Sequence, residues 1–273
     1  GPGQARATQL GRSAPHGLQA QRRADACVAM AAAEAGARVV RSRFQTPVTI
    51  HAKPGEDFAT DVDVAAEREI RDVLAHERPD DAVVGEELGG TAAGRTWLVD
   101  PLCGTVNFAS GIPLVATNVA LAEDGRATVA AVVDPVHRLT YWTDGTTASC
   151  WSAPSGADAV LRPDAACDKV ALDDASPRTP ALLGEPAFSA RFRPLMVSTS
   201  LATVWVAGGR LAGYVADTAD PGSVHFAAGI AIAVAAGCVV TDGDGGQLGP
   251  GARGLIVAAD AATHEALLAA LHG

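Results

Sequence analysis

Residues 97–108 constrain this chain most, because they combine a buried strand, an acid and a turn. The apolar run ends at Asp100, Pro101 fixes the backbone, and Gly104 and Thr105 are expected to open a helix. An acid beside a helix N-terminus, whose free amides can hold an anion, suits a divalent cation that bridges the acid to a phosphate. A plain strand–turn–helix corner with Asp100 as a cap fits the same pattern.

Composition and charge exclude several classes of partner. The 273 residues are 48% hydrophobic and 19% charged, which is a globular composition. The formal net charge of −10 disfavours nucleic acid and anionic membranes, and it disfavours a phosphate substrate unless a metal reverses the local field. We find no basic patch, no secretory signal and no apolar run long enough to span a membrane, so we expect a cytoplasmic protein that uses metal.

The periodicity of apolar residues predicts an α/β chain. Helices are expected over residues 22–44, 64–76, 201–212, 226–236 and from 261 onward, with strands at 48–53, 82–84, 96–99, 139–143, 214–216, 239–241 and 254–258 and a hairpin over 115–122 and 127–134. Residues 151–190 show weak periodicity, so we place a boundary there, between an α+β half at 19–150 and an α/β half at 151–273. Residues 1–18 are expected to be a disordered tail or a tag remnant.

Five blocks in matching order resemble the inositol-monophosphatase-like family of metal-dependent sugar phosphatases. Residues 100–108 match its Asp-Pro-(Leu/Ile)-Asp-Gly-Thr-x-Asn-Phe element at all but one position. The other blocks are 57–63 with Glu67, Gly-Glu-Glu at 85–87, 207–214, and 223–229 with 241–242. Lys53 aligns loosely with a family Lys before the first block, and we expect it to be an ordinary surface residue.

The resemblance implies a layered α-β-α-β-α sandwich, usually a homodimer. It implies a phosphoric monoester hydrolase acting on a small sugar-, inositol- or nucleotide-like phosphate. A first Mg²⁺ would be held by Glu86, Asp100 and the Leu102 carbonyl. Thr105 would orient the attacking water, and Asp63 would support the network around it.

The resemblance also implies where the substrate would bind. The phosphate would lie against Gly104 and Thr105. Ser200 precedes a helix where the family has a Gly-Ser element near the phosphate, and a helix N-cap explains it equally well. Asp217 and Asp220 lie near the family's carboxylate for a substrate hydroxyl, and a solvated loop explains them too.

Two ligands of the family's second Mg²⁺ are replaced in this chain. The second Asp of the Asp-Pro motif is Cys103, and the Asp of the family's Trp-Asp pair is His225. Two unit charges about 4 Å apart interact by about 4 kcal/mol at an effective dielectric of roughly 20. Because Mg²⁺ prefers oxygen ligands over thiolate and imidazole, we expect its second position to be empty or very weak.

These replacements leave three functions open. A one-metal site could still hydrolyse phosphate, with protonated His225 replacing the second ion and donating a proton to the leaving oxygen. The fold could instead serve ligand binding or a tailoring reaction, in which Cys103 could act as a nucleophile with His225 as its base. Asp100, Cys103 and His225 could also bind a softer ion such as Zn²⁺, with an open position for water.

Overall fold

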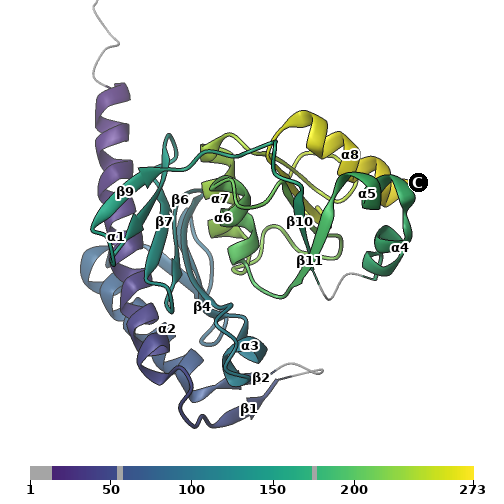
Figure 1. The fold of residues 1–273 in the computed structure, drawn as a ribbon. Helices are drawn as coiled ribbons and strands as arrows, with labels where there is room; N and C mark the ends of the chain where they lie inside the picture. Colours follow the sequence, from purple (N-terminus) through teal and green to yellow (C-terminus); the bar gives the residue numbers. More distant parts are fainter. Residues whose placement is uncertain (1–13, 54–57, 174–176) are drawn as a thin grey trace, which may run out of the picture.

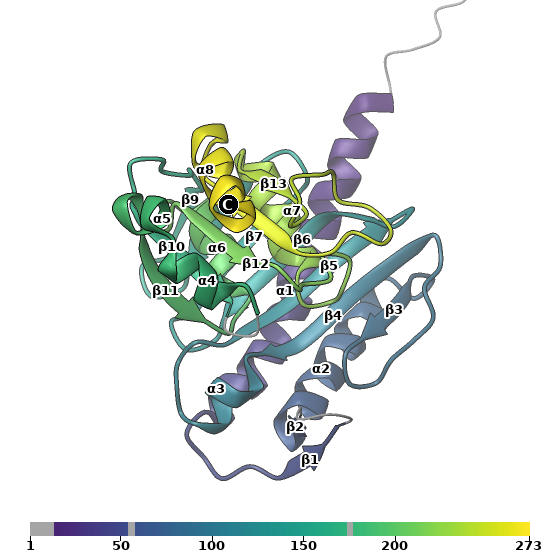
Figure 2. The same ribbon diagram turned by 90° about the vertical axis from the view of Figure 1, so that its right-hand side faces the viewer.

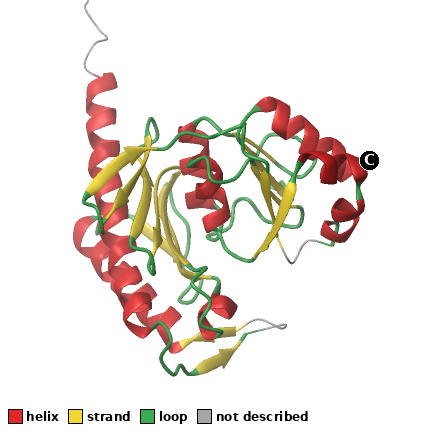
Figure 3. Cartoon of the chain, in the orientation of Figure 1, coloured by secondary structure: helices red, strands yellow, loops and turns green. Residues whose placement is uncertain are grey.

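Helices and sheets alternate in layers across the molecule, in the order helix, sheet, helix, sheet, helix (Figure 1; Figure 3). This computed structural model describes residues 14–53, 58–173 and 177–273. The predicted tail over residues 1–13, and Asp57 of the first family block, lie outside the described residues. The layering confirms the predicted α-β-α-β-α sandwich.

The first sheet has seven strands in the order β3-β4-β5-β6-β7-β8-β9. They are Ala82–Gly85, Arg95–Cys103, Ala116–Glu123, Arg126–Asp134, Leu139–Thr143, Ala148–Ser152 and Ala157–Val160. β3 runs parallel to β4, and the later neighbours pair antiparallel. The boundary expected between residues 150 and 151 falls inside β8. All four residues of β9 are exposed, so no alternation between a buried and a solvated face marks the continuation of the sheet.

Two helices cover the outer face of this sheet: α1 (Ala14–Arg43) and α2 (Asp61–Glu77). Ala29, Ala32 and Ala33 are fully buried, and their small side chains let α1 lie close against its neighbours. α1 begins before the predicted helix, so residues 14–18 are helical rather than part of a tail. A tertiary contact supports this first part, because Gln19 Nε2 donates to Asp144 Oδ2 at 3.0 Å.

The second sheet has five strands in the order β11-β10-β12-β14-β13, and a two-stranded ribbon, β1-β2, stands apart from it. The five strands, in that order, are Arg193–Val197, Lys169–Asp173, Gly213–Ala216, Leu255–Ala258 and Val239–Thr241, and the ribbon is Ile50–Ala52 with Phe58–Thr60. Three helices cover the outer face of the five-stranded sheet: α4 (Thr179–Gly184), α5 (Pro186–Arg191) and α8 (Ala261–His272). This face is turned towards the viewer in Figure 2. None of the described helices combines the length and hydropathy that a membrane span requires.

The middle layer consists of α6 (Leu201–Ala207) and α7 (Ala227–Ala236), which share one apolar core with both sheets. The two helices approach each other closely at Gly229, where an added Cβ would overlap Thr203 Oγ1. This close approach explains why a glycine occupies a helix interior that otherwise favours alanine. It also fixes the turns that precede α6 and α7, which carry Ser200 and His225.

β4 does not end at Asp100, as the sequence predicts, but continues to Cys103. Asp100 pairs with Asn118 and Cys103 pairs with Ala116, so β4 carries one extra residue between these two pairs. The physical reason is Pro101, which has no N–H to donate and is tolerated in a strand at such a bulge. In a regular strand, side chains three positions apart point to opposite faces. The bulge brings those of Asp100 and Cys103 to the same place.

Candidate active site

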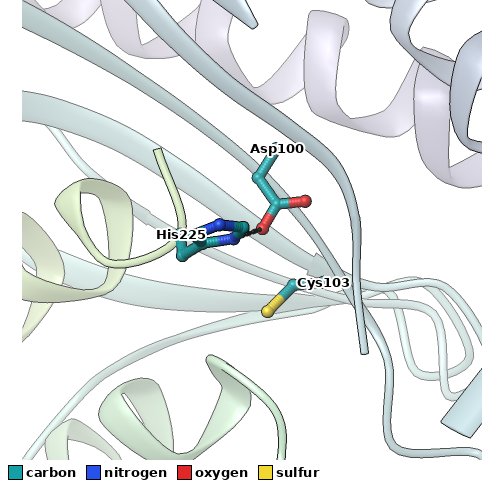
Figure 4. Close-up of side chains that lie close together, drawn as sticks. All are labelled: Asp100, Cys103 and His225. Carbon is teal, nitrogen blue, oxygen red and sulfur yellow. Dashed lines mark hydrogen bonds and ion pairs between the residues drawn. The ribbon is translucent and has the colours of Figure 1, made fainter. Parts of the chain in front are cut away.

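Asp100 lies at the centre of the site and has no exposed surface. Its Oδ2 is 2.8 Å from His225 Nδ1, and its Oδ1 accepts a hydrogen bond from the Leu102 amide at 3.2 Å. His225 lies in the turn before α7, so this contact joins the first sheet to the middle layer (Figure 4). One oxygen of the buried carboxylate is therefore bound by its own strand, and the other is bound by His225 of the middle layer.

Glu86 is positioned by a turn that follows β3. The Glu67 carboxylate of α2 is fully buried beneath this turn and accepts hydrogen bonds from the amides of Glu87, at 2.7 Å, and Leu88, at 3.2 Å. A Cβ at Gly85 would overlap Glu67 Oε1, so the Gly-Glu-Glu block needs its glycine for this close approach. Glu67 thus holds the backbone that presents Glu86 to the site.

Negative charge concentrates where Glu86 approaches Asp100. Burial raises the pKa of Glu86 to about 8, and the negative charge of Asp100 adds to the shift. Lys53 Nζ lies 2.8 Å from Glu86 Oε1 and 2.6 Å from Glu87 Oε1. Burial alone would lower the pKa of Lys53, but the two ion pairs outweigh it and the pKa is raised. The expectation of an ordinary surface residue at Lys53 is therefore wrong.

Asp63 lies in the first turn of α2 and joins a second network. Its Oδ2 accepts from the Thr60 amide at 2.8 Å, which is one half of a capping box, and also from the Thr60 hydroxyl at 2.5 Å. Its Oδ1 lies 3.1 Å from Thr105 Oγ1, which is also 3.1 Å from the Leu102 carbonyl oxygen. Burial raises the pKa of Asp63, and the bonds from Thr60 oppose the shift. Both predicted supporting residues, Asp63 and Thr105, are therefore in contact.

Asp100, Cys103 and His225 converge, each offering one ligand atom, with all three atoms within 4.8 Å of one another (Figure 4). The hydrogen bond to Asp100 is the main cause that raises the pKa of His225 to about 11, and the contact with Cys103 is the second. Burial raises the pKa of the Cys103 thiol. Cys103 and His225 therefore form a cluster with Asp100.

Ser200 and Asn118 hold this cluster from the side. The Ser200 amide donates to Cys103 Sγ at 3.3 Å, and Asn118 Nδ2 lies 2.9 Å from Ser200 Oγ. Ser200 occupies the N-cap position of α6, as the alternative expects, but its side chain makes no capping bond to the helix. Asn118 carried no signal in the sequence, because it is one polar residue on a strand of the predicted hairpin.

The other predicted substrate residues have fixed surroundings. Gly104 adopts φ 95°, and a Cβ there would lie 2.7 Å from the Leu114 carbonyl oxygen, so only glycine fits. It precedes the short helix α3 (Thr105–Ala109). The Asp217 side chain is 2% exposed and pairs with Arg178 at 2.8 Å. The solvated loop considered for Asp217 is therefore wrong. Asp220 is exposed and lies 3.4 Å from Arg253.

The donor set suits one hard divalent cation. Asp100 is fully buried and the Glu86 side chain is 16% exposed, so a cation between these two carboxylates would relieve their mutual repulsion, and the Leu102 carbonyl would add a third oxygen ligand. The thiol of Cys103 and the imidazole of His225, on the other hand, are poor ligands for Mg²⁺.

Fold and site together define a sandwich of the inositol-monophosphatase type, with its acidic blocks gathered at β3 and β4. The sequence model of the inositol monophosphatase family matches residues 21–273. The chain belongs to the inositol monophosphatase family.

Individual relatives agree with this assignment. A histidinol-phosphatase of Mycobacterium tuberculosis is 40% identical over 121 residues, which cover 43% of this chain and 46% of that protein. The chain thus matches about half the length of this curated relative. The Thermotoga maritima IMPase superimposes with a TM-score of 0.80 at 22% identity, covering 92% of this chain and 96% of that one. Mycobacterium tuberculosis SuhB gives a TM-score of 0.70 at 28% identity, covering 90% and 94%.

Proposed function

We propose that this chain hydrolyses small phosphate monoesters with one divalent cation, Mg²⁺, held by Glu86, Asp100 and the Leu102 carbonyl. One observation carries the proposal: Glu86 Oε2 and Asp100 Oδ2 converge on the same point, 3.9 Å and 2.8 Å from His225 Nδ1, and Thr105 Oγ1 joins Asp63 to the Leu102 carbonyl. The names of its relatives, which include a histidinol-phosphatase and an inositol-1-monophosphatase, support the same substrate class.

Each residue contributes a separate part of the chemistry. An Mg²⁺ ion at this position would act as a Lewis acid that polarises the phosphate, and it would lower the pKa of a water. When the Thr105 hydroxyl donates to Asp63, its oxygen is left to accept a hydrogen bond from that water and so to orient it. Lys53 pairs with Glu86, and Glu67 fixes the turn that carries Glu86.

The alternative in which Cys103 is a nucleophile loses support from the same geometry. A reactive thiol needs a lowered pKa and solvent access, whereas burial raises the pKa of Cys103. The Ser200 amide contact at 3.3 Å does not offset that burial.

Phosphate release from a panel of sugar, inositol, histidinol and nucleotide phosphates, with and without Mg²⁺, tests the proposal. Glu86→Gln removes a metal ligand and should lower kcat/KM by at least about 100-fold, the range seen when one group that stabilises the transition state is lost. Glu87→Gln is the matched control, because Glu87 also pairs with Lys53 but is no proposed ligand, and it should retain release. A folded wild-type protein that releases no phosphate from any substrate overturns the proposal, as does full activity of Glu86→Gln.

A further inference from the structure

We infer that Asp100, Cys103 and His225 form a binding site for a thiophilic divalent ion of the Zn²⁺ class. Their three ligand atoms lie within 4.8 Å of one another. Zinc bonds of about 2.0–2.3 Å in a tetrahedral arrangement place ligand atoms roughly 3.3–3.8 Å apart. The side chains therefore need to close by only about 1 Å around the ion, within the reach of small rotamer adjustments.

The chemistry of the three donors selects the ion. A thiolate, an imidazole and a carboxylate together match the mixed ligand sets of protein zinc sites, and three such ligands leave a fourth position open. Mg²⁺ binds sulfur and nitrogen poorly, so the same set discriminates against the ion proposed for Glu86 and Asp100. The two replacements at Cys103 and His225 thus change the class of ion rather than merely weakening a magnesium site.

Neighbouring groups already orient each ligand. The Ser200 amide donates to Cys103 Sγ at 3.3 Å, and Asn118 Nδ2 lies 3.5 Å from Asp100 Oδ2 and 3.3 Å from the His225 carbonyl oxygen. Such outer contacts fix the orientation of metal ligands and contribute to affinity. The His225 side chain is 42% exposed while Asp100 is fully buried, which gives an ion a path from solvent on the imidazole side.

No second group of this kind occurs within the described part of the chain. His137 makes an aspartate contact of the same length, with Nδ1 2.8 Å from Asp134 Oδ2, but no third ligand joins it. The cysteine beside the histidine–aspartate pair is therefore what distinguishes the site. The inference stands apart from the hydrolysis proposed above, because it needs neither Glu86 nor Mg²⁺.

Metal titration of the untagged, chelator-stripped protein tests the inference. Zinc should bind at one ion per chain by elemental analysis, and Co²⁺ should give the intense near-ultraviolet band of a cobalt–thiolate bond. Cys103→Ser should abolish that band. Both Cys103→Ser and His225→Gln should weaken zinc binding more than about 100-fold, since even outer contacts of metal ligands contribute about 10–100-fold.

Cys150→Ser and His137→Gln are the matched controls, and both should keep the band and the affinity. Wild-type protein that shows no cobalt–thiolate band overturns the inference, and this outcome does not depend on whether any variant folds. Zinc affinity that survives both Cys103→Ser and His225→Gln overturns it as well. If zinc binds as expected while no phosphate is released with Mg²⁺, the proposed hydrolysis fails and the zinc site stands.

Discussion

Restoring the two family carboxylates, Cys103→Asp with His225→Asp, should convert the cluster into a second magnesium position. In the present chain His225 is the cationic partner of the fully buried Asp100, with the two side chains 2.8 Å apart. Removing one partner of a fully buried ion pair costs about 3–5 kcal/mol, but solvent screens this pair on the side of His225, which is 42% exposed. The double variant without metal should therefore lose less than that free energy of unfolding at neutral pH.

The new carboxylates would add to this cost. Each like charge about 4 Å from Asp100 contributes up to about 4 kcal/mol at an effective dielectric of roughly 20, and protonation of one carboxyl limits the total. A bound cation reverses the repulsion. Mg²⁺ at about 100 times its dissociation constant should restore about 2.7 kcal/mol.

Urea unfolding with and without Mg²⁺ measures the first effect, and phosphate release measures the second. The double variant should gain Mg²⁺-dependent stability and a Mg²⁺-dependent rate at least about 10-fold above wild type, which corresponds to about 1.4 kcal/mol of barrier. Cys103→Ser with His225→Asn is the control, because it breaks the same ion pair without adding charge. If Mg²⁺ neither stabilises the double variant nor raises its rate, the reasoning from ligand charge is refuted.

Three further predictions concern the framework of the site. Glu67→Ala leaves the amides of Glu87 and Leu88 without their acceptor and should lower the free energy of unfolding by about 1–3 kcal/mol in urea, together with phosphate release; a loss well below about 1 kcal/mol contradicts this role. Gly229→Ala should cost about 1–3 kcal/mol through overlap with Thr203, measured in the same way, and an unchanged midpoint would argue against the close approach. Burial lowers the pKa of His264 in the folded chain below its usual 6.5. As the pH falls, His264 therefore protonates at a higher pH in the unfolded chain than in the folded one, and the free energy of unfolding should decrease below a pH of about 6.5. His264→Gln should flatten that dependence, and an equally steep fall in the variant would exclude His264 as its source.

Turn residues and apolar periodicity predicted those elements of the fold that short stretches of sequence specify by themselves. The turn at Asp124 and Gly125 between two apolar runs indicated the hairpin, which the structure contains as β5 and β6. The weak pattern over residues 151–190 concealed β9 and β10, and β11, which follows this stretch, was not predicted either. Four of the five residues of β11 are exposed, so alternation between a buried and a solvated face is absent there.

The sequence singled out residues whose blocks carry their own chemistry, and it missed contacts with partners from elsewhere in the chain. Glu86, Asp100 and Cys103 belong to recognisable motifs. Lys53 reaches Glu86 from 33 positions away, and Asn118 reaches Ser200 from 82 positions away. Such contacts depend on how the layers stack, which the spacing of residues along the chain does not encode.

The double ion pair of Lys53 makes its ammonium group a built-in competitor of any metal that binds Glu86. Lys53 directly follows β1, at the end of the small ribbon, so binding of an ion and the position of that ribbon are thermodynamically coupled. The coupling is reciprocal. If moving the ribbon away from the first sheet raises the affinity of Glu86 for an ion by some factor, then binding of the ion shifts the equilibrium towards the displaced ribbon by the same factor. A ligand that bound only the ribbon would thus change the affinity of Glu86 for a metal ion without contacting that ion.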